Sequence, residues 1–159
     1  MKTLKDLDRT DRKILAVLQK DGRIANVDLA RTVNLTPTPC LERVRRLENE
    51  GFITGYVALL DPVKANAALC AYIEVQLTST STETVRIFNK HMLALPEVQE
   101  CQLVAGGFDY LIKVRTKDMD HYRRFLGEKL SIIEDISSTN TYVVMEEIKA
   151  SSTIKVSDQ

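Results

Sequence analysis

The sequence predicts an α+β fold with two units, an N-terminal winged helix-turn-helix and a C-terminal ferredoxin-like βαββαβ domain. Three observations predict it. The first third contains a short helix, an asparagine turn and a longer basic helix. From about Ala68, apolar residues alternate with a period of two, as in a half-buried strand. The elements that follow then run in the order β-α-β-β-α-β. We expect residues 1–62 to form the first unit with its wing and linker, residues 63–150 the second unit, and residues 151–159 a polar tail.

The composition is that of an ordinary folded protein. The 159 residues include 22 Lys and Arg against 22 Asp and Glu, and 44% are hydrophobic, which excludes a mostly disordered chain. No apolar run approaches the roughly 20 residues that cross a bilayer, and no apolar segment follows the N-terminal lysines as in a signal peptide. We therefore predict a cytoplasmic protein. Because the net charge is zero, any case for DNA binding depends on where the charges lie.

Local signals predict the first two helices. Asp8 is a suitable N-cap, and Asp11 three residues later forms an approximate capping box in front of an apolar stripe. Gly22 marks the end of this helix region. A short helix follows at about 27–33, with Asn26 as its expected cap. Asn34 then occupies a sharp turn that needs a left-handed residue, a conformation that asparagine tolerates.

The third helix is predicted by its proline and glycine boundaries. Thr36 is a suitable N-cap and Pro37 occupies the first helical position, where a missing N–H costs no hydrogen bond. The helix continues to Glu50 and ends at Gly51. Residues 52–62 are rich in β-prone side chains, so we expect a wing strand followed by a linker.

The second unit is expected to place both of its helices on one face of a four-stranded antiparallel sheet. The predicted strands are residues 70–78, 98–104, 109–116 and 137–148, and the predicted helices are residues 82–95 and 118–132. The other face of the sheet is left bare, and a bare face with apolar positions is expected to be covered by a second copy of the chain. The sequence therefore predicts a homo-oligomer.

The third helix is the main candidate for a nucleic-acid interface. At 100° per residue its apolar side holds Pro37, Cys40, Leu41, Val44 and Leu47. The opposite side holds Thr38, Pro39, Glu42, Arg43, Arg46 and Asn49, with Arg45 at its edge. Guanidinium, hydroxyl and carboxylate groups are the chemistry that reads base edges in the major groove. Arg23, Arg31 and Arg45 are better placed for phosphates. The alternative is a solvated helix face whose arginines are balanced by neighbouring glutamates.

A second candidate site is the loop of residues 105–110, which joins the two middle strands. Consecutive Gly106 and Gly107 permit positive φ angles and a close approach of a ligand to the backbone. Their N–H groups can bind a carboxylate and Asp109 can pair with an ammonium, and a free amino acid carries both groups. The alternative is a plain hairpin turn in which Asp109 bonds to its own loop.

No enzyme or metal site is predicted. Cys40, Cys70 and Cys101 are widely scattered, and with only His91 and His121 they do not have the spacing of a zinc site. We expect free, buried or half-buried thiols. His91 has no obvious acidic partner nearby in sequence, and His121 is expected on the surface. None of the common hydrolase, phosphate-loop or dinucleotide motifs is present.

Several segments together resemble the leucine-responsive/asparagine-responsive (Lrp/AsnC) family of prokaryotic transcription regulators. The resemblance covers essentially residues 5–150, and its most specific motifs are LTPTPCLERVRRLENEGFI at 35–53, GGFDYLIK at 106–113 and TYVVMEEIK at 141–149. It implies a winged helix-turn-helix joined to an ACT-like ligand-sensing domain, dimers that assemble to octamers, and an amino-acid effector bound between dimers. It also implies the effector-response positions Leu103, Gly107, Asp109, Met119, Tyr142, Val143 and Val144.

The sequence thus predicts an amino-acid-responsive, sequence-specific regulator that binds double-stranded DNA. It needs no cofactor, and its effector is leucine, methionine or another small apolar amino acid. One alternative is an architectural, nucleoid-type protein that multimerises on DNA and senses nothing. The other is a metabolic enzyme or its regulatory subunit, against which the helix-turn-helix argues. The operator sequence, the target genes, and activation versus repression are left open.

Overall fold

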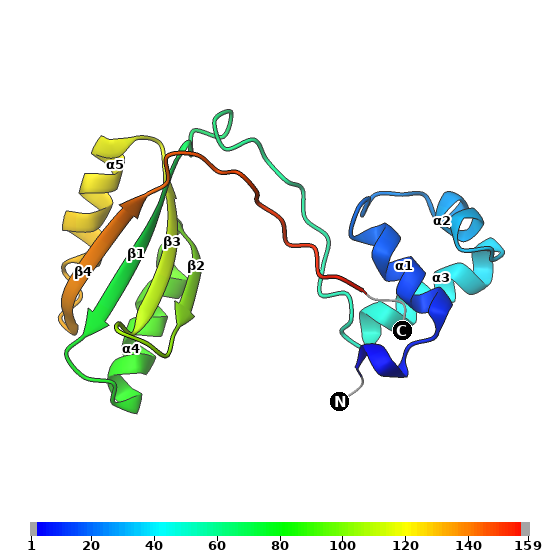
Figure 1. Cartoon of the computed structure of the whole chain (residues 1–159), viewed down its shortest axis with the longest axis horizontal. Coiled ribbons are helices and arrows are strands. Elements are labelled where there is room, and N and C mark those ends of the chain that lie inside the picture. The colour runs from blue at the N-terminus through cyan, green and yellow to red at the C-terminus, as the bar shows by residue number, and fades with distance from the viewer. Residues whose placement is uncertain (1–2, 157–159) are drawn as a thin grey trace. The chain divides into compact units, whose positions relative to one another are not determined.

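The computed structural model describes residues 3–156, and these residues divide into two compact units (Figure 1). The first consists of residues 3–59 together with residues 149–156, and the second of residues 60–148. Each unit has its own apolar core. The chain therefore leaves the first unit at residue 59 and re-enters it at residue 149.

The first unit contains the three predicted helices, α1 (Arg9–Leu18), α2 (Asn26–Thr32) and α3 (Pro37–Asn49), preceded by a 3₁₀ turn, η1 (Leu4–Asp6). Asp8 caps α1 as predicted, because its Oδ1 accepts a hydrogen bond of 2.8 Å from the backbone N–H of Asp11. The helices pack on one another through a common set of fully buried apolar side chains. These are Ile14, Leu29, Ala30, Cys40 and Leu47.

Two left-handed residues set the path of the chain around α3. Asn34 has φ 58° in the turn between α2 and α3, as predicted, and the next N–H, of Leu35, donates to the carbonyl of Ala30 at 2.8 Å. Gly51 has φ 76° just after α3, the conformation that ends many helices. Both positions favour residues that tolerate this region.

Three local expectations for this unit were wrong. The N-cap of α2 is Ala25, and the side chain of Asn26 instead donates to the carbonyl of Pro37 at 2.8 Å. Leu41 is 37% exposed and not part of the buried side of α3. Within residues 52–62 there is no strand. The N–H groups of Phe52 and Ile53 both donate to the carbonyl of Leu47, so the chain folds back on the helix end, and the following residues have no neighbouring strand to pair with.

The C-terminal segment is part of the first unit. The side-chain amide of Gln19 forms two hydrogen bonds with the backbone of Ile154: it donates to the carbonyl at 3.0 Å and accepts from the N–H at 2.7 Å. Val156 packs against the helical core. The end of the chain, expected as a polar tail, thus contributes to the unit that contains α1; residues 157–159 lie outside the described range.

The second unit has the predicted βαββαβ order and a four-stranded antiparallel sheet with strand order β2-β3-β1-β4. Its elements are β1 (Leu69–Leu77), α4 (Thr82–Ala94), β2 (Val98–Leu103), β3 (Tyr110–Thr116), α5 (Met119–Arg124) with the π-helical turn η2 (Phe125–Leu130), and β4 (Ile136–Val143). The last strand is shorter than predicted. After the N–H of Val144 donates to Cys70, residues 145–148 are exposed and outside the sheet.

Both helices cover one face of this sheet, as predicted. Alternate residues of β1 and β3, such as Ile73 and Ile112, are buried against Phe88 of α4 and Phe125 of the turn that extends α5. The opposite face combines apolar and charged residues. Tyr72 and Leu111 are half-buried there, and Lys113 and Arg115 form ion pairs with glutamates. We call this side of the sheet, opposite the helices, the mixed face.

Candidate functional site

The outward face of α3 presents an exposed, polar surface. Thr38, Pro39, Glu42 and Arg45 are all exposed, and Leu41 lies among them. Among residues 3–156, no ion pair or hydrogen bond engages the guanidinium of Arg45. Arg45 therefore faces solvent more directly than the edge position predicted for it. This face offers a free cation, a hydroxyl and a carboxylate, the groups suited to base edges and phosphates.

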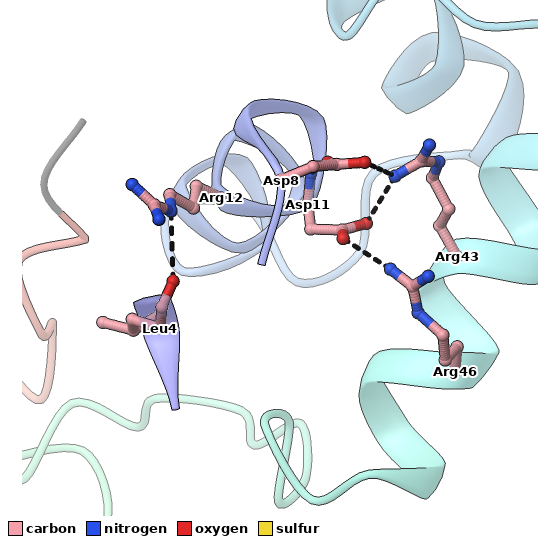
Figure 2. A network of polar contacts seen from close by, with 6 residues as sticks. All are labelled: Leu4, Asp8, Asp11, Arg12, Arg43 and Arg46. Atoms are coloured by element: carbon pink, nitrogen blue, oxygen red, sulfur yellow. Dashed lines mark hydrogen bonds and ion pairs between the residues drawn. The ribbon is translucent and has the colours of Figure 1, made fainter. Parts of the chain in front are cut away.

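Arg43 and Arg46, unlike Arg45, both form ion pairs. Figure 2 shows the two guanidiniums directed toward Asp11. Arg43 Nη1 lies 2.5 Å from Asp8 Oδ2 and 2.8 Å from Asp11 Oδ1. Arg46 Nη2 pairs with the other oxygen of Asp11. The Asp11 side chain is only 3% exposed, against 29% for Arg43 and 46% for Arg46. We call these four residues the arginine clamp. It joins the first turn of α1 to the middle of α3.

The clamp has the electrostatic effects expected of close opposite charges. Burial alone would raise the pKa of Asp8, but hydrogen bonds from the Asp11 N–H and from Arg43 outweigh it, and the pKa lies below the ordinary value. The bonds to Asp8 and Asp11 also raise the pKa of Arg43. Both groups are therefore held in their charged forms.

The other two predicted phosphate contacts, Arg23 and Arg31, are exposed. Arg31 Nη1 lies 3.0 Å from Asp28 Oδ1, one turn earlier on α2, and both side chains are mostly in solvent. An exposed pair of this kind contributes little and opens readily. Both arginines are therefore accessible to a phosphate.

Asp8 and Asp11 were not predicted as partners of the arginines, although the sequence contains a signal for them. Asp11, Ile14 and Leu15 share one side of α1 at helical spacing, which places an acid within the buried stripe. Arg43 falls three residues after Cys40 and four before Leu47, the two buried residues of α3. An acid in one apolar stripe and a base in another predict a buried pair, because a lone buried charge is costly.

In the second unit, the glycine-aspartate loop between β2 and β3 is exposed at its tip. Neither Gly106 nor Gly107 has a positive φ, so the loop does not use the left-handed conformations that glycine permits. A Cβ at either position meets nothing within 4 Å, and Leu103 at the end of β2 is also exposed. The loop tip therefore has open space beside its backbone.

Asp109 neither points freely into solvent nor closes its own loop as the alternative predicted. Its Oδ2 accepts from the Leu77 N–H at 2.7 Å and from Gln76 Nε2 at 2.9 Å, and its own N–H donates to Val75 at 3.0 Å. The carboxylate thus anchors the loop to the end of β1.

The remaining predicted effector residues form a second group, away from the loop. Val143 pairs with Ala71 near the start of β1, and Val144 follows it. Tyr142 is exposed and donates to Glu74 Oε2 at 3.1 Å. Met119, exposed at the start of α5, follows β3 at this same end of the sheet.

The predicted effector residues are thus divided between the two ends of β1. From Val75, which bonds to Asp109, to Ala71, which pairs with Val143, the strand rises by roughly 13 Å. Two surface hollows of about 530 and 490 Å³ lie near α5, and none of the predicted effector residues lines either of them. A single copy of this unit therefore does not enclose an amino acid with these residues.

Neither a metal-binding site nor a reactive thiol is evident among the described residues. Residues 3–156 contain no group of three His, Cys, Asp or Glu side chains placed to bind a metal ion. Cys40 and Cys70 are buried and Cys101 is half-buried, all as free thiols, as predicted. Burial raises the pKa of Cys101 to about 11, which disfavours a reactive thiolate at neutral pH. No helix in this part of the chain combines the length and apolarity that crossing a bilayer requires.

Comparison with known proteins agrees with this two-unit arrangement. A winged helix-turn-helix DNA-binding model matches residues 7–54, and the Lrp/AsnC ligand binding domain model matches residues 70–154. The leucine-responsive regulatory proteins of Klebsiella pneumoniae and Escherichia coli K12 are each 53% identical over 152 residues, covering 96% of this chain and 93% of theirs.

Solved structures give the same result. A Neisseria meningitidis transcriptional regulator in complex with L-Met is 35% identical, with a TM-score of 0.90 over 94% of this chain and 97% of that one. AsnC of Escherichia coli is 26% identical, with a TM-score of 0.84 over 92% and 97% of the two chains. The chain belongs to the Lrp/AsnC family of transcription regulators, which are not enzymes, and it combines a winged helix-turn-helix for DNA with an amino-acid ligand-binding domain.

Proposed function

We propose that this regulator is of the leucine-responsive type, reads specific DNA sites with the outward face of α3, and responds to leucine or methionine bound between copies of its second unit. The observation that carries the proposal is the pairing, in one chain, of an exposed α3 surface with two separate groups of effector positions. Such a regulator acts where the DNA is, in the cytoplasm.

On the DNA side, the exposed residues of α3 support direct readout in a major groove. The guanidinium of Arg45 has no partner among residues 3–156, and Thr38 and Glu42 lie on the same exposed face of the helix. Arginine can bind guanine in a bidentate manner, and a carboxylate can accept from cytosine. Arg23 and Arg31, exposed outside α3, would then bind phosphates and fix the orientation of the protein.

On the effector side, the separation of the two groups supports a site completed by a second copy. The loop group offers backbone N–H groups at Gly106 and Gly107, and the other group offers the apolar side chains of Met119 and Val143. A ligand held between copies stabilises the assembly in which both groups meet, and so changes how many α3 helices engage DNA together. The likeness to a Neisseria regulator bound to L-Met supports methionine as one effector.

The mixed face of the sheet supports dimers that assemble further, as far as octamers. Tyr72, Leu111 and Tyr142 provide apolar area there, and Lys113 and Arg115 are already neutralised by ion pairs within their own copy. A face with neutralised charges and aromatic residues resembles the composition of protein interfaces.

The DNA half of the proposal is tested by replacing Arg45 with Ala in the full-length protein. Affinity for a duplex selected from a random library should fall by about tenfold to a hundredfold, the value of one good bidentate contact, and affinity for random DNA much less. Arg86→Ala, an exposed arginine on α4, is the matched control and should change neither affinity. Unchanged discrimination by Arg45→Ala would remove that residue from base readout.

The effector half is tested by titrating leucine and methionine into the full-length protein by calorimetry, together with sedimentation and gel shifts on the selected duplex. Met119→Ala should weaken binding by about tenfold, because it removes apolar contact with the effector side chain. Met145→Ala, fully exposed and outside both groups, is the control. No heat with any of the common amino acids would leave an architectural DNA-binding protein as the better description.

A further inference from the structure

We propose that Asp11 is the positioning residue of the recognition helix α3: by binding Arg43 and Arg46 it keeps both guanidiniums away from DNA and leaves sequence readout to Thr38, Glu42 and Arg45. The inference rests on the proposed reading of DNA by α3, and it assigns different roles to three arginines that lie within four positions of one another.

The burial of Asp11 is the first argument. Its side chain is 3% exposed, and each of its two carboxylate oxygens accepts from a different arginine (Figure 2). Asp8, at the N-cap of α1, adds a second bond to Arg43. Separating a buried carboxylate from its partners costs much free energy, because its negative charge would remain buried without an opposite charge or water beside it. The clamp therefore holds its arginines more firmly than an exposed pair does.

The spacing of the clamp is the second argument. Asp8 and Asp11 are three residues apart at the start of α1, and Arg43 and Arg46 are three residues apart on α3. Residues at this spacing are neighbours on a helix surface, so two neighbouring positions on one helix bind two on the other. A turn of α3 about its axis by one residue, 100°, would separate both arginines from Asp11. The same turn would replace the residues that face outward. The clamp thus fixes which side chains of α3 can meet a base.

The charge balance of the clamp is the third argument. Two carboxylates face two guanidiniums, so the group offers no net attraction to phosphate. Each phosphate contact by a free cation adds about 0.9 to the slope of binding against salt, and this attraction does not depend on sequence. Withholding two arginines therefore lowers the affinity for random DNA relative to a selected site. By contrast, Arg45 has no partner among the described residues.

The test is Asp11→Asn in the full-length protein, with Asp28→Asn as the matched control. Both variants lose one negative charge in the DNA-binding unit, but Asp28 is exposed, and within residues 3–156 its carboxylate forms an ion pair with Arg31 alone. Affinities for the selected duplex and for a random duplex of the same length are measured between ~50 and ~200 mM salt. Asp11→Asn should bind random DNA about fivefold to tenfold more tightly, with a steeper slope by about 1 per protomer, and should lose at least tenfold in discrimination. Asp28→Asn should change both affinities by the same factor.

The proposal is overturned if Asp11→Asn weakens binding to both duplexes equally with an unchanged salt slope, which is what a purely structural residue predicts. Arg46→Gln keeps the proposal testable if Asp11→Asn does not fold by circular dichroism. Its salt slope should equal that of the wild type, and a slope lower by about 1 per protomer would mean that Arg46 binds phosphate and would overturn the proposal. A wild type without preference for the selected duplex would contradict the proposed function, and the variant slopes would still decide the role of Asp11.

Discussion

Single residues in this protein differ in role according to the partners that the fold gives them. Arg43, Arg45 and Arg46 lie close together on α3, but of these three only Arg45 is without an ion pair among residues 3–156. The apolar stripe of α1 contains Asp11, which indicates a buried ion pair. Which arginines of α3 bind Asp11 depends on how the two helices pack, because the partners lie more than 30 positions apart in the chain. The polar face was predictable, and the identity of its free cation was not.

Asp109, in the loop between β2 and β3, also has a partner that is distant in sequence. The loop and its aspartate were recognised from sequence, but both roles considered for the carboxylate were local to the loop or the ligand. The carboxylate instead accepts from Gln76 and Leu77, more than 30 positions away. A contact between residues this far apart in the sequence depends on how β1 and β3 align in the sheet, and no local sequence pattern encodes that alignment.

The pH dependence of stability tests the clamp at the level of one residue. The pKa of Asp8 is lowered in the folded protein, so its contribution to stability is present above the ordinary Asp value of about 4 and is lost as the pH falls through the folded pKa. Because Asp8 is half exposed, the contribution should be below about 1 kcal/mol. Urea unfolding of wild type and Asp8→Asn from neutral pH to about pH 3 should give a stability difference that shrinks toward acid. A difference that stays constant or grows would contradict it.

At the scale of elements, the helices whose boundaries are determined by residues close in the sequence were predictable. The helices of the first unit followed from Asp8, Pro37, Asn34 and Gly51, and all three were confirmed. The strand expected in residues 52–62 was wrong, because β-prone side chains form a strand only where another strand offers hydrogen bonds. The π-helical turn Phe125–Leu130, closed by the Ser131 N–H to the Leu126 carbonyl at 2.8 Å, also had no visible sequence signal.

Gly51 allows a test of how α3 ends. Its φ of 76° disfavours any side chain, and a Cβ there would meet nothing within 4 Å, so Gly51→Ala should cost only backbone strain, about 1 kcal/mol. Gly55→Ala, equally open but without a positive φ, is the control and should be nearly neutral. Thermal unfolding of the two variants measures the difference. Equal melting temperatures would mean that the left-handed turn is not what costs energy at Gly51.

At the scale of the whole molecule, the family and the order of the two units were predictable, because specific motifs extend along nearly the entire chain. The membership of residues 149–156 in the first unit was not. The segment is short and mostly polar. The paired hydrogen bonds of Gln19 with Ile154 and the packing of Val156 connect it to the helices.

The contribution of this segment to the first unit is measurable. Gln19→Ala removes both bonds to Ile154 and should lower stability by about 1 kcal/mol, or about 4–8 °C in the melting temperature of a unit this size. Lys20→Ala, an exposed neighbour, is the control. Two-unit proteins need not unfold in one step, so hydrogen exchange at the amides of α1 reports on the correct unit. Unchanged exchange in Gln19→Ala would mean that the two hydrogen bonds to Ile154 do not stabilise the unit.

The return of the chain to its starting unit also orders events at the ribosome. Domains generally fold from the N-terminal end during synthesis, so the three helices emerge and pack while residues 149–156 have not yet been translated. The hydrogen bonds between Gln19 and Ile154 can therefore form only after nearly all of the polypeptide has been translated. A truncated translation product would carry the DNA-reading helices without their final segment.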